Sequence, residues 1–228
     1  MIGNNNLIDS FLREQGVSLV GFADLAEVDP AERENLRFGV CFAIALKVFP
    51  GMEEPTADYY NEYKAINRRL REISYLLEER IIGEGYKAYS LARNRQDEQY
   101  RTKLPFKTLA TRAGIGWIGK SSTLITREYG SAIRLNGVVT DMPFVTGTPV
   151  NESTCGACRA CVDACPGKAI AGLNWSPDRT RDELVNPYVC KQTVIKRGEA
   201  MGVTEGSCGI CLAACPWTQR YMKRLREA

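Results

Sequence analysis

The clearest pattern of apolar and polar positions lies in the first half of the chain, between residues 59 and 81. Apolar side chains recur there at steps of three and four residues, the spacing of one face of an α-helix: Tyr59, Tyr63, Ile66, Leu70, Ile73, Leu77 and Ile81. Gly83 or Gly85 is expected to end the helix, because glycine readily adopts the backbone conformation of helix C-termini. The pattern therefore predicts one long amphipathic helix.

Shorter apolar runs before and after this helix predict strands. The run 38–49, FGVCFAIALKVF, is apolar at successive positions, which is typical of a strand buried on both faces. Further helices are expected at 7–16 and at 106–113, the second opened by Pro105. This alternation predicts a fold of the α/β or α+β class. The other expected strands cover 17–23, 86–92, 122–126 and 131–141.

The composition of the chain changes near residue 150. Of the 9 cysteines, all except Cys41 lie between Cys155 and Cys215. We therefore predict two domains, an α/β domain over 1–150 and a cysteine-rich domain over 151–228. Because Cys41 lies inside an expected strand, we expect it to be buried and to bind nothing.

Charge and apolar content exclude several classes of function. The net charge of +3 is weaker than the basic footprint of a typical nucleic-acid-binding domain. The N-terminal sequence MIGNNNLIDS lacks the basic start and the apolar segment of a secretory signal. The longest apolar run, Val40 to Leu46, is far shorter than the roughly 20 residues that cross a membrane. We therefore expect a cytoplasmic protein without membrane contact.

The cysteines and the lack of histidine narrow the chemistry further. In a cytosolic chain, clustered cysteines indicate metal ligands before disulfides. The chain has 0 histidines, so no imidazole can bind a metal or carry a proton. Proton transfer must therefore use Asp, Glu, Lys, Tyr, Cys or water.

Two cysteine motifs follow one another in the second domain. The first, CGACRACVDACP at 155–166, has the Cys-x2-Cys-x2-Cys-x3-Cys-Pro run of bacterial ferredoxins. The second, CGICLAACP at 208–216, lacks the leading cysteine, which Cys190 can supply from a loop. In such runs the last cysteine binds the other cluster when two are present. The predicted ligands are Cys155, Cys158, Cys161 and Cys215 for cluster one, and Cys165, Cys190, Cys208 and Cys211 for cluster two, both of the [4Fe-4S] type.

Two other uses of these cysteines stay open. Four thiolates also suit a zinc ion, so paired zinc sites are an alternative. Three close spacings that end in Cys-Pro are unusual for zinc, which favours iron–sulfur clusters. Disulfide bridges are a further alternative that the expected compartment disfavours.

A glycine-rich segment raises the question of nucleotide binding. Residues 114–121, GIGWIGKS, match the pattern G-x-x-x-x-G-K-[ST] of phosphate-binding loops. Such a loop leaves a strand and opens a helix, whereas this segment follows the helix expected at 106–113 and precedes an expected strand. Bulky Trp117 also fits poorly in a backbone cradle. A nucleotide site and a tight helix-to-strand turn anchored by Trp117 are both possible readings.

The glycine segment and the cysteine motifs together resemble a known family. The stretch ATRAGIGWIGKSSTLITREYGSAIRLNGVVTDMPF at 110–144, followed by the two motifs and Cys190, resembles the epoxyqueuosine reductases. These are cobalamin-dependent iron–sulfur enzymes distantly related to reductive dehalogenases. The resemblance covers roughly residues 100–217. Its specific part is AGIGWIGK with EYGS and TD-x-P ahead of the cysteines.

The resemblance implies a function for both domains. The first domain would hold a base-off corrinoid, which needs no histidine below the cobalt. The two clusters would pass electrons to the corrinoid from a low-potential donor such as a ferredoxin or flavodoxin. The substrate would be a small molecule or a modified nucleoside, and the phosphate-loop match would be accidental. The residues that line the corrin would be Gly116, Trp117, Gly119, Lys120, Leu124 and Leu135.

The sequence also departs from the family. The reductases carry an acidic proton donor in a V-D-x-x-P stretch, and the corresponding segment here is NRQDEQYRTKLP. Tyr100, with Asp97 and Glu98 close by, is the nearest candidate donor, and a surface or core aromatic is its plainer reading. Longer members continue into a helical repeat domain that helps to bind tRNA, whereas this chain stops at Ala228 in a short basic helix, which weakens the expectation of tRNA binding. A non-catalytic ferredoxin-type electron carrier without corrinoid is therefore the alternative function.

Overall fold

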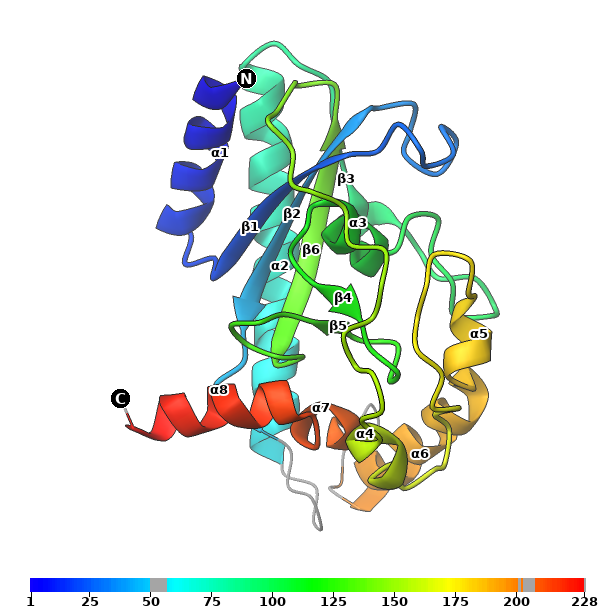
Figure 1. Cartoon of the computed structure of the whole chain (residues 1–228). Helices are drawn as coiled ribbons and strands as arrows, with labels where there is room; N and C mark the ends of the chain where they lie inside the picture. The colour runs from blue at the N-terminus through cyan, green and yellow to red at the C-terminus, as the bar shows by residue number, and fades with distance from the viewer. Residues whose placement is uncertain (50–56, 201, 203–207, 228) are drawn as a thin grey trace. The chain divides into compact units, whose positions relative to one another are not determined.

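The computed structural model of the chain describes residues 1–49, 57–200, 202 and 208–227 (Figure 1). The chain forms two compact units, each assembled from separate segments. The predicted division into 1–150 and 151–228 stays a prediction. Unit 1 consists of Met1–Ile44, Ile66–Gly116 and Arg134–Val150, and unit 2 consists of Ala45–Ala65, Trp117–Ile133 and Asn151–Ala228.

Unit 1 is built on a four-stranded sheet in the order β1-β2-β6-β3. Strands β1 and β2 pair antiparallel with Leu19 opposite Ala43, and β3 and β6 pair antiparallel with Ala88 opposite Thr140. All four strands lie where the apolar runs predict strands, and the mixed helix-and-strand fold class is confirmed. The bounds are β1 Leu19–Asp24, β2 Phe38–Ala45, β3 Ala88–Ser90 and β6 Ile133–Thr140.

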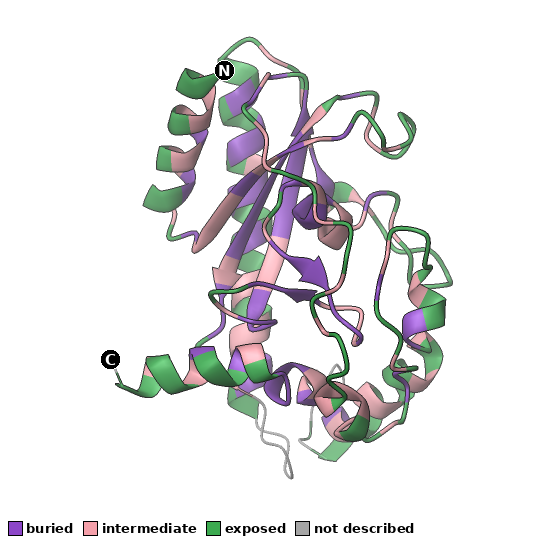
Figure 2. Cartoon of the chain, in the orientation of Figure 1, coloured by how far each residue is buried: buried purple, intermediate pink, exposed green. Residues whose placement is uncertain are grey.

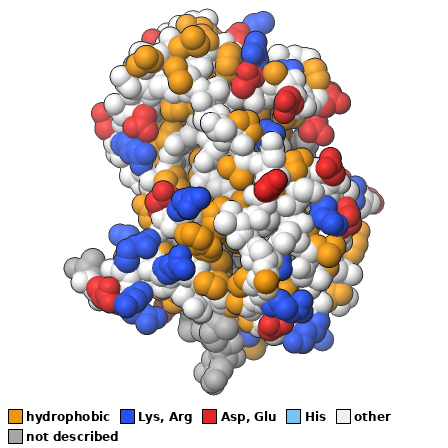
Figure 3. All heavy atoms as spheres, viewed as in Figure 1, with side chains coloured by type: hydrophobic (Ala, Val, Ile, Leu, Met, Phe, Trp, Pro, Cys, Tyr) orange, Lys and Arg blue, Asp and Glu red, His pale blue; other side chains and the backbone are white. Residues whose placement is uncertain are grey.

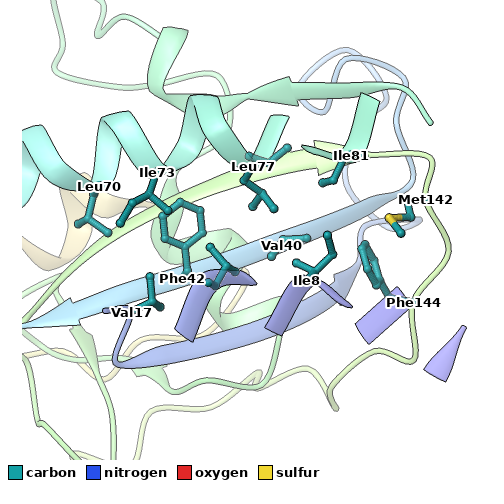
Figure 4. Close-up of a cluster of buried hydrophobic side chains, with 12 residues drawn as sticks. Ile8, Val17, Val40, Phe42, Leu70, Ile73, Leu77, Ile81, Met142 and Phe144 are labelled. Carbon is teal, nitrogen blue, oxygen red and sulfur yellow. The ribbon is translucent and has the colours of Figure 1, made fainter. Parts of the chain in front are cut away.

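Helices α1 (Ile2–Glu14) and α2 (Ala57–Gly83) supply much of the apolar core of unit 1. Figure 4 shows the apolar face of α2 pointing towards β2, and Figure 2 shows that the strands of the sheet are mostly buried. The three-four spacing along the sequence therefore identified the buried face correctly. The fully or nearly buried core residues are Ile8, Leu12, Val17, Val40, Phe42, Leu70, Ile73, Leu77, Ile81, Val138, Met142 and Phe144.

Two element ends differ from the sequence prediction for identifiable reasons. Strand β2 ends at Ala45, because the Glu62 carboxylate accepts hydrogen bonds from the backbone N–H groups of Lys47 (3.0 Å) and Val48 (2.8 Å). Helix α1 begins at Ile2 instead of residue 7. Its first turn is held by long-range hydrogen bonds from the side-chain amides of two asparagines: Asn4 to the Pro143 carbonyl (2.9 Å) and Asn5 to the Val145 carbonyl (2.8 Å).

Helix α3 (Phe106–Arg112) lies unusually close to the sheet of unit 1. A Cβ atom at Gly39 on β2 would lie 2.3 Å from Leu109 Cδ1, and one at Gly137 on β6 would lie 2.3 Å from Leu109 Cδ2. Real side chains do not approach this closely. These two glycines on neighbouring strands therefore allow Leu109 to dock, and with it the helix that leads into the glycine-rich segment.

Unit 2 is made of short helices and one small hairpin. Strands β4 (Trp117–Ile118) and β5 (Leu124–Ile125) pair antiparallel. The core is small, and three of the proposed ligands (Cys161, Cys165 and Cys211) pack against it. The core residues are Ile118, Ala169, Ile170, Trp175, Leu184 and Val185. The helices are α4 Ala160–Asp163, α5 Arg181–Leu184, α6 Pro187–Ala200, α7 Ile210–Ala213 and α8 Pro216–Glu227.

Helix α8 is the short basic helix that the C-terminal sequence predicts. Basic side chains gather over it in the space-filling view (Figure 3). Among the described helices, none combines the length and the apolar content that a membrane span requires. The basic residues of α8 are Arg220, Lys223, Arg224 and Arg226.

Candidate iron–sulfur centre

The two cysteine motifs fold in similar ways. In each, a cysteine is followed by a glycine with left-handed backbone, Gly156 (φ +53°) or Gly209 (φ +65°). Gly209 directly precedes the four-residue helix α7, whereas Arg159, with a φ of −123°, directly precedes the four-residue helix α4; the two helices contact each other. The last cysteine of each motif then closes the turn: Cys165 N–H donates to the Val162 carbonyl and Cys215 N–H to the Leu212 carbonyl, both at 3.3 Å. Both Cys-Gly steps therefore use the ability of glycine to adopt positive φ without strain, although they stand at different places in the two motifs.

Cys161 lies among the other cysteines predicted to bind cluster one. Burial raises the pKa of its thiol to about 11, and the nearby charges of Cys155, Cys215 and Cys158 raise it further. A thiol with so high a pKa stays protonated at neutral pH without a metal. Binding of iron would therefore have to release protons from this group of sulfurs.

The cysteines predicted to bind cluster two also lie together. Burial raises the pKa of Cys190, and the charges of Cys208 and Cys165 add to the effect. The pKa of Cys211 is raised to about 12, first by burial and then by Cys208 and Cys190, with smaller effects from Cys161 and Cys165. The effect of Cys161 on Cys211 indicates that the two groups are neighbours. The assignment of ligands to clusters stays a prediction.

Burial raises the pKa of the Cys215 thiol overall, and hydrogen bonds at the start of helix α8 offset part of this effect. Cys215 directly precedes Pro216, the first residue of α8, and the pKa of its thiol is raised by burial but lowered by hydrogen bonds from the backbone N–H groups of Thr218 and Trp217. The start of a helix favours negative charge, because its first N–H groups point outwards. Pro216 thus begins a helix as well as ending the cysteine turn.

A close contact holds the first turn of α8 against the EYGS segment. Gly130 has a φ of +57°, and a Cβ atom on it would lie 2.2 Å from the backbone nitrogen of Thr218. The backbone N–H of Ser131 donates to the Thr218 hydroxyl at 3.0 Å. The EYGS segment therefore touches Thr218, one of the two residues that donate hydrogen bonds to Cys215.

Cys190 lies in a helix, and the prediction that it lies in a loop was wrong. It sits in the first turns of α6, whose start is capped by Asn186: the Asn186 side-chain oxygen accepts hydrogen bonds from the N–H groups of Tyr188 and Val189, both at 3.1 Å. Asn at the cap followed by Pro187 at the first helical position is a standard helix start, so the sequence NPYVC did contain the signal.

Within the described ranges, no group of three or more Cys, Asp or Glu side chains is arranged to hold a single metal ion. In a [4Fe-4S] cluster each thiolate binds a different iron, so the four sulfurs stand around a larger object than one ion. Cys41, by contrast, is fully buried in β2, as its place in an expected strand predicts, and burial raises the pKa of its thiol.

The glycine-rich segment forms a hairpin and not a phosphate-binding loop. It follows helix α3, and β4 and β5 flank a turn in which Gly119 N–H donates to the Thr123 carbonyl (2.9 Å) and Ser122 N–H to the Gly119 carbonyl (2.8 Å). These N–H groups are used within the turn. The segment that matches the nucleotide pattern thus lies between a helix and a strand, as the sequence predicts.

The hairpin carries three of the predicted corrin-lining residues, and one of them, Gly119, lies close to a cysteine of unit 2. A Cβ atom at Gly119 would lie 3.5 Å from the Cys155 sulfur. Trp117 packs edge-on against Trp217, with ring centroids 5.4 Å apart, and its buried Nε1 has no hydrogen-bond partner in the described part of the chain. Lys120 is only 5% exposed.

The remaining predicted site residues have different surroundings. Leu124 is buried on β5 of unit 2, whereas Gly116 and Leu135 belong to unit 1. Tyr100, also in unit 1, is 37% exposed in a turn where its φ is +59° and its N–H donates to the Asp97 carbonyl at 3.0 Å.

Comparison with known proteins supports both the cysteine motifs and the wider resemblance. Residues 154–218 match a family model described as a 4Fe-4S double cluster binding domain. An epoxyqueuosine reductase of Atelocyanobacterium thalassa is 34% identical over 126 residues, covering 51% of this chain and 38% of the relative. One from a Synechococcus strain is 32% identical over 167 residues, covering 72% of this chain and 49% of the relative. The chain thus spans about half or less of the length of these relatives.

Solved structures show the same fold. The epoxyqueuosine reductase of Streptococcus thermophilus has a TM-score of 0.60 at 21% identity, with 94% of this chain and 66% of that one covered. A catabolic reductive dehalogenase has a TM-score of 0.72 at 16% identity, with 98% of this chain and 34% of that one covered. The chain therefore shares its fold with both groups, and it resembles the epoxyqueuosine reductases in sequence, with a double [4Fe-4S] domain at residues 154–218.

Proposed function

We propose that the chain is an iron–sulfur oxidoreductase that passes electrons through two [4Fe-4S] clusters to a corrinoid, where a substrate is reduced. The observation that carries the proposal is the arrangement of eight cysteines as two neighbouring groups in a double-cluster domain. The proposed ligands of cluster one are Cys155, Cys158, Cys161 and Cys215, and those of cluster two are Cys165, Cys190, Cys208 and Cys211.

The surroundings of the sulfurs suit iron–sulfur clusters. Most of the thiols are partly or fully buried, and a buried thiolate is stable when iron neutralises its charge. Hydrogen bonds to the sulfurs tune the reduction potential of a cluster. The backbone N–H of Ala169 makes such a bond to the Cys165 sulfur at 3.3 Å, and Thr218 and Trp217 make them to Cys215.

The hairpin between Trp117 and Leu124 supports the corrinoid part of the proposal. Gly119 brings the backbone of the hairpin close to the Cys155 sulfur, so a macrocycle bound against the hairpin would lie near cluster one. Lys120 and Trp117 Nε1 are buried donors that can bind the polar groups at the edge of such a cofactor. When bound, cobalamin would supply a cobalt centre that reduces the substrate. One solved neighbour, with a TM-score of 0.68, is a reductive dehalogenase whose structure suggests a mechanism for B12-dependent dehalogenation.

The other proposed site residues rest on the resemblance alone. Gly116, Leu124 and Leu135 would complete the lining of the cofactor site. Tyr100, which is exposed, would donate the proton that the substrate requires. We propose a modified nucleoside as the substrate, because relatives are named epoxyqueuosine reductases and one was solved with an epoxyqueuosine-modified tRNA stem loop.

Anaerobic reconstitution with iron, sulfide and cobalamin tests the proposal. We expect about eight irons per chain, as two cubane clusters require, and a cobalt absorption spectrum that titrates with one cobalamin. Lys120→Met should weaken cobalamin binding about tenfold through the loss of one charge-assisted hydrogen bond, whereas Lys168→Met, at an exposed site, should not.

Three other results would contradict parts of the proposal. Fewer than roughly five irons with intact cysteines would contradict the two clusters. Intact clusters without cobalamin binding would favour the ferredoxin-type carrier. ATP binding that Lys120→Met abolishes would restore the nucleotide reading of residues 114–121.

A further inference from the structure

Helix α6 (Pro187–Ala200) presents a face of mixed apolar and basic residues directly behind a proposed cluster ligand. Cys190 lies in this helix and is exposed. Tyr188 (51% exposed) and Ile195 (40%) lie seven residues apart and hence on one face of the helix. Large apolar side chains with such exposure are uncommon in the described part of unit 2, where Leu173 is the other example. An exposed apolar pair of this kind indicates a contact surface.

The charge of this face is basic. Lys191 and Lys196 are both exposed, flank Tyr188 and Ile195 at helical spacing, and form no ion pair with a described residue. Glu199, four residues after Ile195, is exposed on the same face and offsets one of the two positive charges, which leaves the face with a net charge of +1 (two Lys, one Glu). An apolar centre with basic side chains at its rim is complementary to an acidic protein surface.

One face of helix α6 is directed towards the ligands of cluster two, and the opposite face is exposed to solvent. At 3.6 residues per turn, Cys190 lies nearly opposite Tyr188 and Ile195. Arg197 lies close enough to Cys208 for its charge to act on that thiol, so this other face is directed towards the ligands of cluster two. A partner bound to the exposed face would therefore be separated from cluster two by about the thickness of one helix, ~10 Å.

The surface near cluster one differs. Cys158 is also exposed, but the exposed residues beside it are Gly156, Ala157 and Arg159. The charge of Arg159 is offset by Asp163, 3.5 Å away. Residues 156–159 therefore offer neither a large apolar side chain nor an unpaired basic one.

We infer that the face of α6 formed by Tyr188, Lys191, Ile195 and Lys196 docks an acidic one-electron carrier protein of the ferredoxin or flavodoxin class, which reduces cluster two. The inference rests on the proposed function, because it requires that cluster two exists. One electron leaves the reduced carrier and enters the oxidised cluster, and no bond or proton changes. Electrons would then enter at cluster two and leave through cluster one, beside the Gly119 hairpin.

The test is the rate at which a reduced acidic ferredoxin reduces the chain with both clusters assembled, followed by stopped-flow absorbance under anaerobic conditions. For the unmodified chain we expect the second-order rate constant to fall as salt is raised, since salt screens the attraction. The double variant Lys191→Glu/Lys196→Glu should react about tenfold or more slowly at low salt and lose this salt dependence. Ile195→Ser should slow the reaction less.

A matched control separates the local effect from the change in total charge. Lys64→Glu/Lys223→Glu alters the net charge equally at exposed positions on α2 and α8, and it should keep most of the rate. Iron content and reduction by titanium(III) citrate must be the same in all variants, so that a failure to assemble clusters is recognised as a failure of the proposed function. An α6 variant that reacts like the unmodified chain, or a control that slows equally, would overturn the inference.

Discussion

The two compact units are stabilised by different kinds of interaction. Unit 1 has a continuous apolar core between its sheet and the helix α2, which is 27 residues long. In unit 2, helices α4, α5 and α7 have four residues each, and the small apolar core is lined by cysteines. Helices this short are not stable by themselves, because ordering the backbone of the first turn costs more free energy than its single hydrogen bond contributes. The comparison indicates that unit 1 is stabilised by apolar burial, whereas the cysteine-rich part of unit 2 depends on what its sulfurs bind.

Removal of the clusters is expected to have the largest effect on this contrast. A chelator with an oxidant should abolish protection from hydrogen exchange across 155–200 and 208–215, while the β2 and α2 amides of unit 1 keep theirs. Mass spectrometry of exchanged peptides measures both regions in one sample. Equal protection of the cysteine segments with and without iron would show that their fold does not depend on the clusters.

Loss of one cysteine ligand should distinguish the two clusters of the cysteine-rich part. Cys190→Ala is expected to lower the iron content from about eight to about four and to leave the electron paramagnetic resonance signal of cluster one largely intact. Cys41→Ala is the matched control, because that cysteine is buried in β2 of unit 1 and should not change iron content. Unchanged signals of both clusters in Cys190→Ala would mean that the fourth ligand of cluster two is a different group.

A core substitution should affect the other unit. Leu77 is 0% exposed on the buried face of α2, so Leu77→Ala should lower the free energy of unfolding of unit 1 by about 2–5 kcal/mol. Urea unfolding followed by far-ultraviolet circular dichroism gives the change. Leu76→Ala, at a 42% exposed neighbour, should cost far less. A loss of iron in Leu77→Ala at temperatures where unit 1 is folded would weaken the contrast between the units.

The smallest expected effect concerns acid. A hydrogen bond and ion pair from Arg37, 2.8 Å away, lower the pKa of Asp24 in unit 1. Because the pKa of Asp24 is lower in the folded state than in the unfolded state, the pair stabilises the fold at pH values above the ordinary pKa of Asp. This stabilisation is lost as the pH falls through the pKa of the folded state. Asp24→Asn should therefore remove a small stabilisation at pH 7 and leave stability near pH 2 unchanged. Because both groups are partly exposed, high salt should reduce the difference, and a larger loss in acid than at pH 7 would contradict the assignment.

The sequence predicted those parts of the molecule that depend on local pattern. The spacing of α2, the strands of unit 1 and the two cysteine turns all follow from neighbours within a few residues. Unit 2, however, gathers Ala45–Ala65 and Trp117–Ile133 with the cysteine region through distant partners. The Tyr221 hydroxyl, for example, donates to the Leu46 carbonyl at 3.0 Å. A contact between segments that are distant in the sequence leaves no periodic pattern in it. The sequence could therefore indicate the ligand residues but not the segments that surround them.

The contact between Gly130 and Thr218 has a consequence for electron flow. Thr218 and Trp217 donate hydrogen bonds to Cys215, and Gly130 leaves no space in which the Thr218 backbone could move towards it. The sulfur is thus restrained by chain that binds no iron itself. A restrained ligand changes position little when its cluster gains or loses an electron, which keeps the nuclear rearrangement, and with it the barrier to transfer, low. We therefore expect a bulkier residue at position 130 to slow electron exchange at cluster one even where all eight sulfurs still hold their irons.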